Sequence, residues 1–401
     1  MIYVYYLLAA LLIYMSYRSL RGGQAYLEYF RHELEKPASS YTPSATIIVP
    51  CKGLDDGLED NLLAILQQEY PRFEVVFVVD SKEDSARAMI DTVLMQNQSE
   101  GIRSKMIIAP LSVESSQKVE NLRTAVLHAS DESEIFVFVD SDTRPKEDWL
   151  RSLIAPLEDE SVGASTGYRW FISERASLGS ELRAVWNASI ASALGPNRKS
   201  NFCWGGSMAI GRATFERLNI RDKWRGTLSD DFAMTKAVRE AGLSIYFVPQ
   251  ALTASVGNSS LIETIEFTNR QMKITRVYAP HLWLLSLFGA VIFNLVMLGS
   301  LLIVIFSRRN DLTVYFAAFT LVIVTLCSAG KSWLRLKAVK HVLAERWPAV
   351  NRQWFTQMTL WLISPLLFLI NCLTATFSRR VTWRGIRYEL KSPTETVIIT
   401  D

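Results

Sequence analysis

The stretch "IFVFVDSDTRPKEDWL", residues 135–150, combines an apolar run with two carboxylates. Its first five residues, 135–139, are β-branched or aromatic, which is typical of a buried β-strand. Asp140 and Asp142 follow at once, and a proline and a helix-like pattern come after them. In open α/β sheets, ligands bind beyond the carboxyl ends of the strands. The stretch therefore predicts a strand that carries two carboxylates to a binding edge.

Similar apolar runs recur between residues 43 and 270, where they alternate with polar segments of helical periodicity. They include "ATIIVP" (45–50), "EVVFVVD" (74–80), "KMIIAP" (105–110) and "SIYFVP" (244–249). Such alternation is typical of an α/β domain with a mainly parallel sheet and helices on both faces. No run in this region is long enough to span a bilayer.

The composition narrows the class of protein. The chain has 401 residues, with 43 basic and 40 acidic side chains and a net charge of +3. A nucleic-acid-binding protein would carry a concentrated basic surplus, so we expect no nucleic-acid partner. Apolar residues make up 49 % of the chain, which indicates that part of it is embedded in a membrane. The four cysteines form no C-x-x-C pair, which argues against a disulfide scaffold or a zinc cluster.

Long apolar runs lie at both ends of the chain. "MIYVYYLLAALLIYMSY" is followed by Arg18 and Arg21, and we interpret residues 1–20 as a membrane anchor with the next domain on the cytoplasmic side. A buried core helix is the alternative. Runs at 281–306, 312–330 and 354–377 are about long enough to span, and their number of crossings stays open. The basic, amphipathic stretch 331–354 predicts an interfacial helix or an ordinary amphipathic helix packed on the soluble domain.

These patterns divide the chain into three parts. We expect an anchor at 1–20, a cytoplasmic domain at 43–270, and a C-terminal membrane region with an interfacial helix and a basic tail at 271–401. The protein would then be a multi-pass integral membrane protein.

The carboxylates at strand ends suggest a metal-bound ligand. Asp80 ends a second strand, although a single Asp there is often a turn former or a helix N-cap. Asp140 and Asp142 repel each other unless a cation neutralises them, and Mg²⁺ or Mn²⁺ prefers such oxygens and can bridge a diphosphate. Neither G-x-G-x-x-G nor a Walker A motif is present, so carboxylates and a metal would hold a nucleotide.

A second acidic motif lies at 229–231, "SDD", before a helical pattern. Ser229 followed by Asp230 and Asp231 fits an N-cap with acids that favour the helix dipole. The alternative is a carboxylate placed as a general base.

Five segments together resemble a known family. In this order they resemble the inverting glycosyltransferases of family 2 with the GT-A fold, and most closely the ceramide glucosyltransferase group, family 21. The segments are "VPCKGLDDGLEDNL" (49–62), "SQKVENL" (116–122), "FCWGGSMAIGRATFERL" (202–218), "SDDFAMTKAV" (229–238) and "VTWRGIRYELK" (381–391).

The resemblance implies a role for each matching position. Asp80 would meet the uracil or ribose of a UDP-sugar, and Asp140 the ribose and diphosphate. Asp142 would ligate the divalent cation, Mn²⁺ or Mg²⁺. Asp231 would be the catalytic base. Lys118 would contact the nucleotide or hold its loop.

One motif departs from the family pattern. The family has Gln or Arg, two further residues and then Arg-Trp. Here Arg270 occupies the first position, but Lys273 and Ile274 replace Arg-Trp. Lys273 keeps a charge for a phosphate while losing bidentate geometry. We expect Arg270 and Lys273 at the diphosphate. In the separate "SDD" motif, Asp230 matches a family position that is acidic but is not the catalytic base.

The implied function is transfer of a sugar, glucose first, from a UDP-sugar to the hydroxyl of a membrane lipid. A ceramide-like acceptor is the first choice, and diacylglycerol or a hopanoid comes next. Two alternatives stay open: a processive polysaccharide synthase, and a non-catalytic membrane protein that binds a nucleotide sugar.

Overall fold

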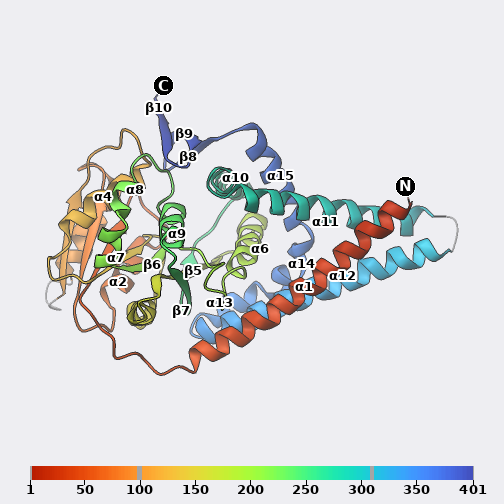
Figure 1. Ribbon diagram of the computed structural model, residues 1–401, viewed down its shortest axis with the longest axis horizontal. Coiled ribbons are helices and arrows are strands. Elements are labelled where there is room, and N and C mark those ends of the chain that lie inside the picture. Colours follow the sequence, from red (N-terminus) through yellow and green to blue (C-terminus); the bar gives the residue numbers. More distant parts are fainter. Residues whose placement is uncertain (1, 97–101, 308–310, 401) are drawn as a thin grey trace. The chain divides into compact units, whose positions relative to one another are not determined.

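The structure is a computed structural model that describes residues 2–96, 102–307 and 311–400 (Figure 1). Met1 of the expected anchor therefore lies outside the described residues. The chain forms two compact units. The helical unit comprises Met1–Arg31, Ala176–Ser192 and Ser259–Ser378, and the sheet unit comprises His32–Arg175, Ala193–Asn258 and Arg379–Asp401. The boundaries thus differ from those expected, because residues 176–192 leave the sheet unit and the basic tail joins it.

The sheet unit contains a seven-stranded sheet with the order β3-β2-β1-β4-β6-β5-β7. All its neighbouring strands are parallel except β6, which is antiparallel to β4 and β5. The predicted mainly parallel sheet is confirmed, whereas the sequence analysis did not predict the antiparallel strand β6. The strands are β1 (Ala45–Pro50), β2 (Phe73–Val79), β3 (Arg103–Ile108), β4 (Ile135–Val139), β5 (Val162–Ile172), β6 (Ser207–Gly211) and β7 (Ser244–Val256).

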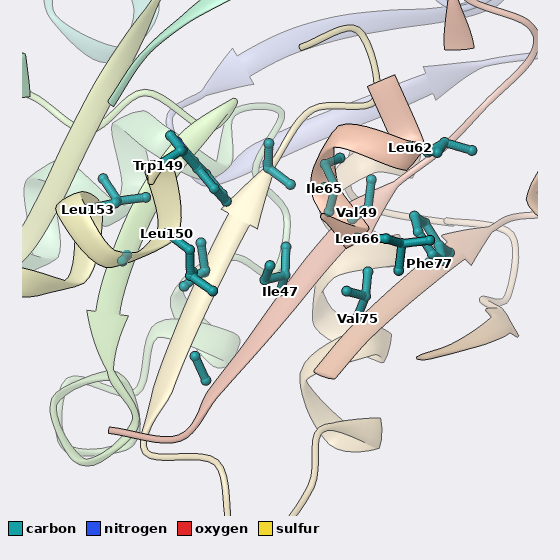
Figure 2. Packing of buried hydrophobic residues seen from close by; sticks show 14 of the residues in the cluster. Ile47, Val49, Leu62, Ile65, Leu66, Val75, Phe77, Trp149, Leu150 and Leu153 are labelled. Atoms are coloured by element: carbon teal, nitrogen blue, oxygen red, sulfur yellow. The ribbon is translucent and has the colours of Figure 1, made fainter. Parts of the chain in front are cut away.

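Helices cover both faces of this sheet, because alternate residues of each buried strand point to opposite sides. Ile47 and Val75 face one apolar cluster, while Ile48 and Val76 face another. Figure 2 shows the first cluster, in which side chains of two helices pack together with side chains of β1 and β2. The residues labelled there are Ile47, Val49, Leu62, Ile65, Leu66, Val75, Phe77, Trp149, Leu150 and Leu153.

The helices of the sheet unit are mostly short. They are α2 (Leu58–Leu66), α3 (Ser85–Gln96), α4 (Gln117–Ala125), α5 (Trp149–Ile154), α7 (Arg212–Arg217), α8 (Ile220–Lys223) and α9 (Asp230–Glu240). In Figure 2, α2 and α5 lie on the same face of the sheet.

The strand order reverses between β1 and β4, near the middle of the sheet. The chain runs from β1 outward through β2 and β3, and then returns to β4 on the other side of β1. The loops after β1 and β4 therefore diverge at a topological switch point, which is where ligands bind in such sheets.

The basic tail forms a second, antiparallel sheet with the order β10-β9-β8. Its strands are β8 (Arg380–Trp383), β9 (Ile386–Ser392) and β10 (Glu395–Ile399). Val381, Tyr388 and Leu390 are buried, so this sheet is packed within the sheet unit. The sequence, by contrast, predicts the tail as part of the C-terminal membrane region.

The helical unit contains the apolar runs. Pro280–Phe306 and Leu312–Val342 are each long and apolar enough to cross a membrane, and Trp354–Leu362 with Ser364–Phe377 forms a third candidate that is bent by 56°. The helices are α1 (Ile2–Leu34), α6 (Leu178–Ala191), α10 (Leu261–Tyr278), α11 (Pro280–Phe306), α12 (Leu312–Val342), α13 (Trp347–Arg352), α14 (Trp354–Thr359) and α15 (Ser364–Phe377).

The expected anchor is the first part of α1, which does not reach the apolarity of α11 or α12 because tyrosines interrupt its apolar run. Ala9 and Leu12 pack against residues of α11 and α12, and in Figure 1 α11 comes close to α1 and α12 toward the N-terminal end of α1. The anchor therefore packs on other helices for part of its length, and its role as an anchor stays a prediction.

The amphipathic stretch after residue 330 is not a separate helix at its start. It continues α12 without a break to Val342. Leu336 and Val339 are buried inside the helical unit, and buried Arg335 donates a hydrogen bond of 3.2 Å to Gln357 Oε1. Residues 331–342 therefore pack inside the helical unit, whereas the sequence predicts a helix at the membrane interface or on the soluble domain.

Candidate functional site

The D-x-D pair lies at the switch point. β4 ends at Val139, and Asp140 and Asp142 follow directly. Between them, the Ser141 hydroxyl donates a hydrogen bond of 2.8 Å to Asp55 in the loop after β1. The strand-end position predicted from the sequence is confirmed, and the two diverging loops are in contact.

Lys118 links two of the aspartates. It lies in the first turn of α4, which begins because the Ser116 side chain caps the Val119 N–H. Lys118 Nζ lies 2.7 Å from Asp140 Oδ1 and 3.4 Å from Asp230 Oδ1. Burial opposes both charges of the Lys118–Asp140 pair, but their attraction outweighs it, lowering the pKa of Asp140 and raising that of Lys118. Three separate segments are thereby joined by ion pairs.

Asp230 and Asp231 begin α9, and the Ser229 side chain caps the Phe232 N–H. The capping interpretation is therefore confirmed, yet the two carboxylates differ. Asp230 is 2 % exposed, and burial raises its pKa to about 6 against the opposing effect of Lys118. Asp231 is only partly buried and accepts the Phe232 N–H at 2.7 Å. Of the two neighbours, Asp231 is the one that a ligand can reach.

Two glycines let these acids come together. Gly205 and Gly206 precede β6 in "FCWGGSM". A Cβ atom on Gly205 would lie 2.2 Å from Asp230 Oδ2, and one on Gly206 would lie 2.7 Å from Asp140 Oδ2. The Gly205 N–H also donates to Asp231 at 3.4 Å. A residue larger than glycine at either position would collide with these carboxylates.

Asp142 has one paired and one unpaired oxygen. Arg169 Nη1, from β5, lies 3.4 Å from Asp142 Oδ2, while Oδ1 is buried without a hydrogen-bond partner in the described part of the chain. Burial raises the pKa of Asp142 and outweighs the effect of Arg169. An acid that is poorly compensated in this way fits a cation.

A complete metal cage is absent from the described ranges, in which no three His, Cys, Asp or Glu residues gather to hold an ion. Mg²⁺ bound with nucleotides is usually held by one or two carboxylates together with the substrate phosphates. The unpaired oxygen of Asp142, beside Asp140, is consistent with that kind of site.

Asp80 follows β2 and is 5 % exposed. It forms an ion pair with Lys52, in the loop after β1. The Gly53 N–H of the same loop donates a hydrogen bond of 2.9 Å to Asp84. These contacts bring the ends of β1 and β2 together, and contact of Asp80 with a nucleotide stays a prediction.

Two predicted site residues belong to the helical unit. Arg270 and Lys273 lie on α10, and burial lowers the pKa of Lys273. Ile274, which replaces the family Trp, is buried. Arg276 donates a hydrogen bond of 2.9 Å to Thr376 O at the end of α15, so it stabilises that helix terminus. Binding roles for Arg270 and Lys273 stay predictions.

The match to known families decides the identity. Residues 4–396 match glycosyl transferase family 21, which is nearly the whole chain. The chain belongs to glycosyl transferase family 21. The expected family is confirmed, and so is the fold class: the sheet unit of this family 21 protein is mixed α/β with a mainly parallel sheet, as in the GT-A type.

Solved glycosyltransferases are distantly similar to this family 21 chain. A mannosyltransferase from Pyrobaculum calidifontis, solved with GDP-Man and Mn²⁺, is 18 % identical over 92 % of this chain and 98 % of its own, with a TM-score of 0.47. GalNAc-T7, solved with UDP, GalNAc and Mn²⁺, is 14 % identical over 58 % and 49 %, with a TM-score of 0.41. Glucosyl-3-phosphoglycerate synthase from Mycobacterium tuberculosis is 14 % identical over 59 % and 84 %, with a TM-score of 0.36.

Sequence reasoning missed four charged residues at the site of this family 21 protein. Lys52 and Asp55 lie in the Gly- and Asp-rich turn after β1, whose composition was a signal. Arg169 gave no signal, because it lies within a long strand. Arg384 forms an ion pair with Asp55 from the far end of the chain. Its signal was the Arg384-Gly385 pair between two segments in which apolar and polar residues alternate, a pattern that is typical of a hairpin turn.

Proposed function

We propose that this family 21 transferase moves a sugar, with glucose first, from a UDP-sugar to the hydroxyl of a membrane lipid, with a ceramide-like acceptor first. The observation that carries the proposal is the Lys118 bridge. It links the D-x-D loop to the start of α9, where Asp231 is accessible. Donor-binding acids and a candidate base are thus neighbours in one unit.

In this mechanism Asp231 accepts the proton of the acceptor hydroxyl. The acceptor oxygen forms a bond to the anomeric carbon of the sugar while the bond from that carbon to UDP breaks. A single displacement inverts the configuration, so an α-linked UDP-sugar gives a β-glycoside. The N–H groups of Phe232 and Gly205 hold the Asp231 carboxylate in position for this role.

Charge builds up on the diphosphate as the bond breaks. A divalent cation held by Asp142 would supply compensating positive charge to the diphosphate. Lys118 keeps Asp140 ionised and oriented beside it. Arg270 and Lys273 are further candidates for the diphosphate, because arginine and lysine both bind phosphates.

The candidate membrane-spanning helices support the proposal of a lipid acceptor. A lipid hydroxyl is presented at the bilayer surface rather than in bulk water, so an enzyme for it benefits from membrane helices. α11 and α12 are long and apolar enough for that purpose. A cytoplasmic sheet unit would meet the cytoplasmic UDP-sugar.

The test is transfer by the purified full chain in lipid nanodiscs with Mn²⁺. UDP-glucose, UDP-galactose and UDP-N-acetylglucosamine are each offered with ceramide, diacylglycerol or a soluble oligosaccharide, and released UDP and product mass are measured. We expect one hexose on ceramide, and no product with Asp231→Asn.

Other outcomes decide between the alternatives. Successive additions to the oligosaccharide alone would establish a polysaccharide synthase. Binding of a UDP-sugar without transfer to any acceptor would establish a non-catalytic binding protein.

A further inference from the structure

The tail hairpin has an unusual residue at its tip. β8 ends at Trp383 and β9 begins at Ile386, so Arg384 and Gly385 form a two-residue turn. Both have positive φ, at 50° and 79°. Such turns favour Asn-Gly or Gly-Gly, since residues with a Cβ and a long side chain rarely adopt this conformation. An arginine kept at an unfavourable backbone position calls for a reason in what its side chain does.

The tip is held at the carboxylate edge. Tyr388 of β9 is 1 % exposed, and its hydroxyl accepts a hydrogen bond of 3.1 Å from the Gln117 N–H at the start of α4. The Trp383 ring centroid lies 6.0 Å from Lys118 Nζ. The hairpin is therefore anchored on the helix that carries the Lys118 bridge, and its position is not that of a loose tail.

The Arg384 guanidinium faces acids. It forms an ion pair with Asp55, which also accepts the Ser141 hydroxyl from between the two D-x-D aspartates. Its charge also interacts with those of Asp140 and Asp142. The side chain remains 40 % exposed. A guanidinium has five N–H donors, so contact with Asp55 leaves donors for another anion.

We propose that Arg384 is a donor-binding residue, whose guanidinium contacts the diphosphate of the nucleotide sugar at the D-x-D edge. This inference rests on the proposed function. Arginine can bind phosphate oxygens through two parallel N–H groups. The ion pair with Asp55 would hold the Arg384 side chain at the D-x-D edge, where the diphosphate would bind. The C-terminal hairpin is then part of the donor site, although some 240 residues separate it from the D-x-D pair in sequence.

The turn itself offers a clean variant. Arg384→Asn removes the charge and places a residue that the turn prefers, so folding should be preserved. Arg384→Lys retains a charge without the bidentate geometry. Arg387→Asn is the matched control, because it removes an exposed arginine from the neighbouring strand.

Binding of uridine, UMP and UDP to the full chain is measured by titration calorimetry with Mn²⁺. We expect Arg384→Asn to weaken UDP binding about tenfold or more, as for loss of a charged hydrogen bond, while uridine binding is unchanged. Arg384→Lys should lie between it and the wild type, and Arg387→Asn should match the wild type. The UDP-to-uridine affinity ratio isolates the phosphate contact from any structural effect.

Two outcomes would overturn the inference in distinguishable ways. If the wild type binds UDP and Arg384→Asn keeps the same UDP-to-uridine ratio, Arg384 does not bind the diphosphate and the proposed function stands. If the wild type binds none of the three, the proposed function fails and this inference fails with it.

Discussion

The Lys118 amine lies 2.7 Å from the Asp140 carboxylate, and the two side chains are 14 % and 22 % exposed. The same amine lies 3.4 Å from Asp230 Oδ1. One cation therefore serves two acids, and its removal would leave both facing each other in a site from which water is largely excluded.

Lys118→Met tests this bridge. Breaking a buried ion pair by removing one partner typically costs about 3–5 kcal/mol, so we expect a loss of that order in the free energy of unfolding. Thermal unfolding in detergent, followed by tryptophan fluorescence, measures it. Lys236→Met is the control, since its pair with Glu240 is exposed and should contribute less than about 1 kcal/mol. Equal stability of the two variants would contradict the prediction.

Asp230→Asn should change how stability depends on pH. The pKa of Asp230 is raised to about 6, above the value of about 4 in an unfolded chain. Between these values the folded protein binds the extra proton, so stability falls as pH rises from about 4 to 6. The variant lacks this fall, which we expect to amount to roughly 2 kcal/mol. Unfolding temperatures of both proteins at pH 4.5 and 7 measure it, and parallel curves would refute the assignment.

Asp231→Asn should keep donor binding and lose transfer. The amide is nearly isosteric but cannot accept the acceptor proton, and loss of a general base typically lowers the rate about 10²–10⁴-fold. UDP binding by calorimetry and lipid product by mass spectrometry separate the two steps. An inactive Asp230→Asn together with an active Asp231→Asn would show that the wrong neighbour had been assigned.

Asp142→Ala should abolish the dependence of UDP binding on metal. Its buried Oδ1 has no partner within the described residues, and its carboxylate would ligate the cation. Calorimetric titration with UDP, with and without Mn²⁺, is the measurement. Asp148→Ala removes an exposed acid from the same segment and should leave the Mn²⁺ effect intact. A Mn²⁺ effect that survives in Asp142→Ala would exclude the metal role.

Gly206→Ala should displace the acids at the site. The added Cβ would lie 2.2 Å from the Trp204 ring and 2.7 Å from Asp140 Oδ2, and such overpacking typically costs about 1–3 kcal/mol. We expect a lower unfolding temperature and weaker UDP binding. Gly195→Ala provides the comparison, because nothing lies within 4 Å of its Cβ position. If both alanine variants behave like wild type, the close approach has no consequence.

The strands that carry the D-x-D pair and Asp80 were predictable, because a buried parallel strand is a continuous apolar run that ends abruptly in polar residues. β6 was not, since "SMAIG" is short, rich in small residues and antiparallel. Its pairing depends on β4 and β5 rather than on its own residues. The local sequence pattern therefore predicts the strands that are continuous apolar runs. It misses β6, which forms only by pairing with β4 and β5.

The site divides in the same way. Asp140, Asp142 and Asp231 lie in motifs that can be read from adjacent residues. Arg169 and Arg384 reach the same place through strand pairing and a hairpin fold, and the partners of these residues lie far away in the chain. Such long-range ion pairs leave no trace in local periodicity, because the two charges meet only after the sheet has formed.

Placement of the tail constrains how the chain is threaded through a bilayer. The chain leaves the sheet unit after Asn258 and rejoins it at Arg379, so a sheet unit that lies on one side of a bilayer would require an even number of crossings between these two points. If α11 and α12 cross outward and back, we predict that the bent segment from Trp354 to Phe377 is not a third crossing. It would enter the bilayer and turn back at its 56° bend, as a hairpin open to the side that holds the sugar donor.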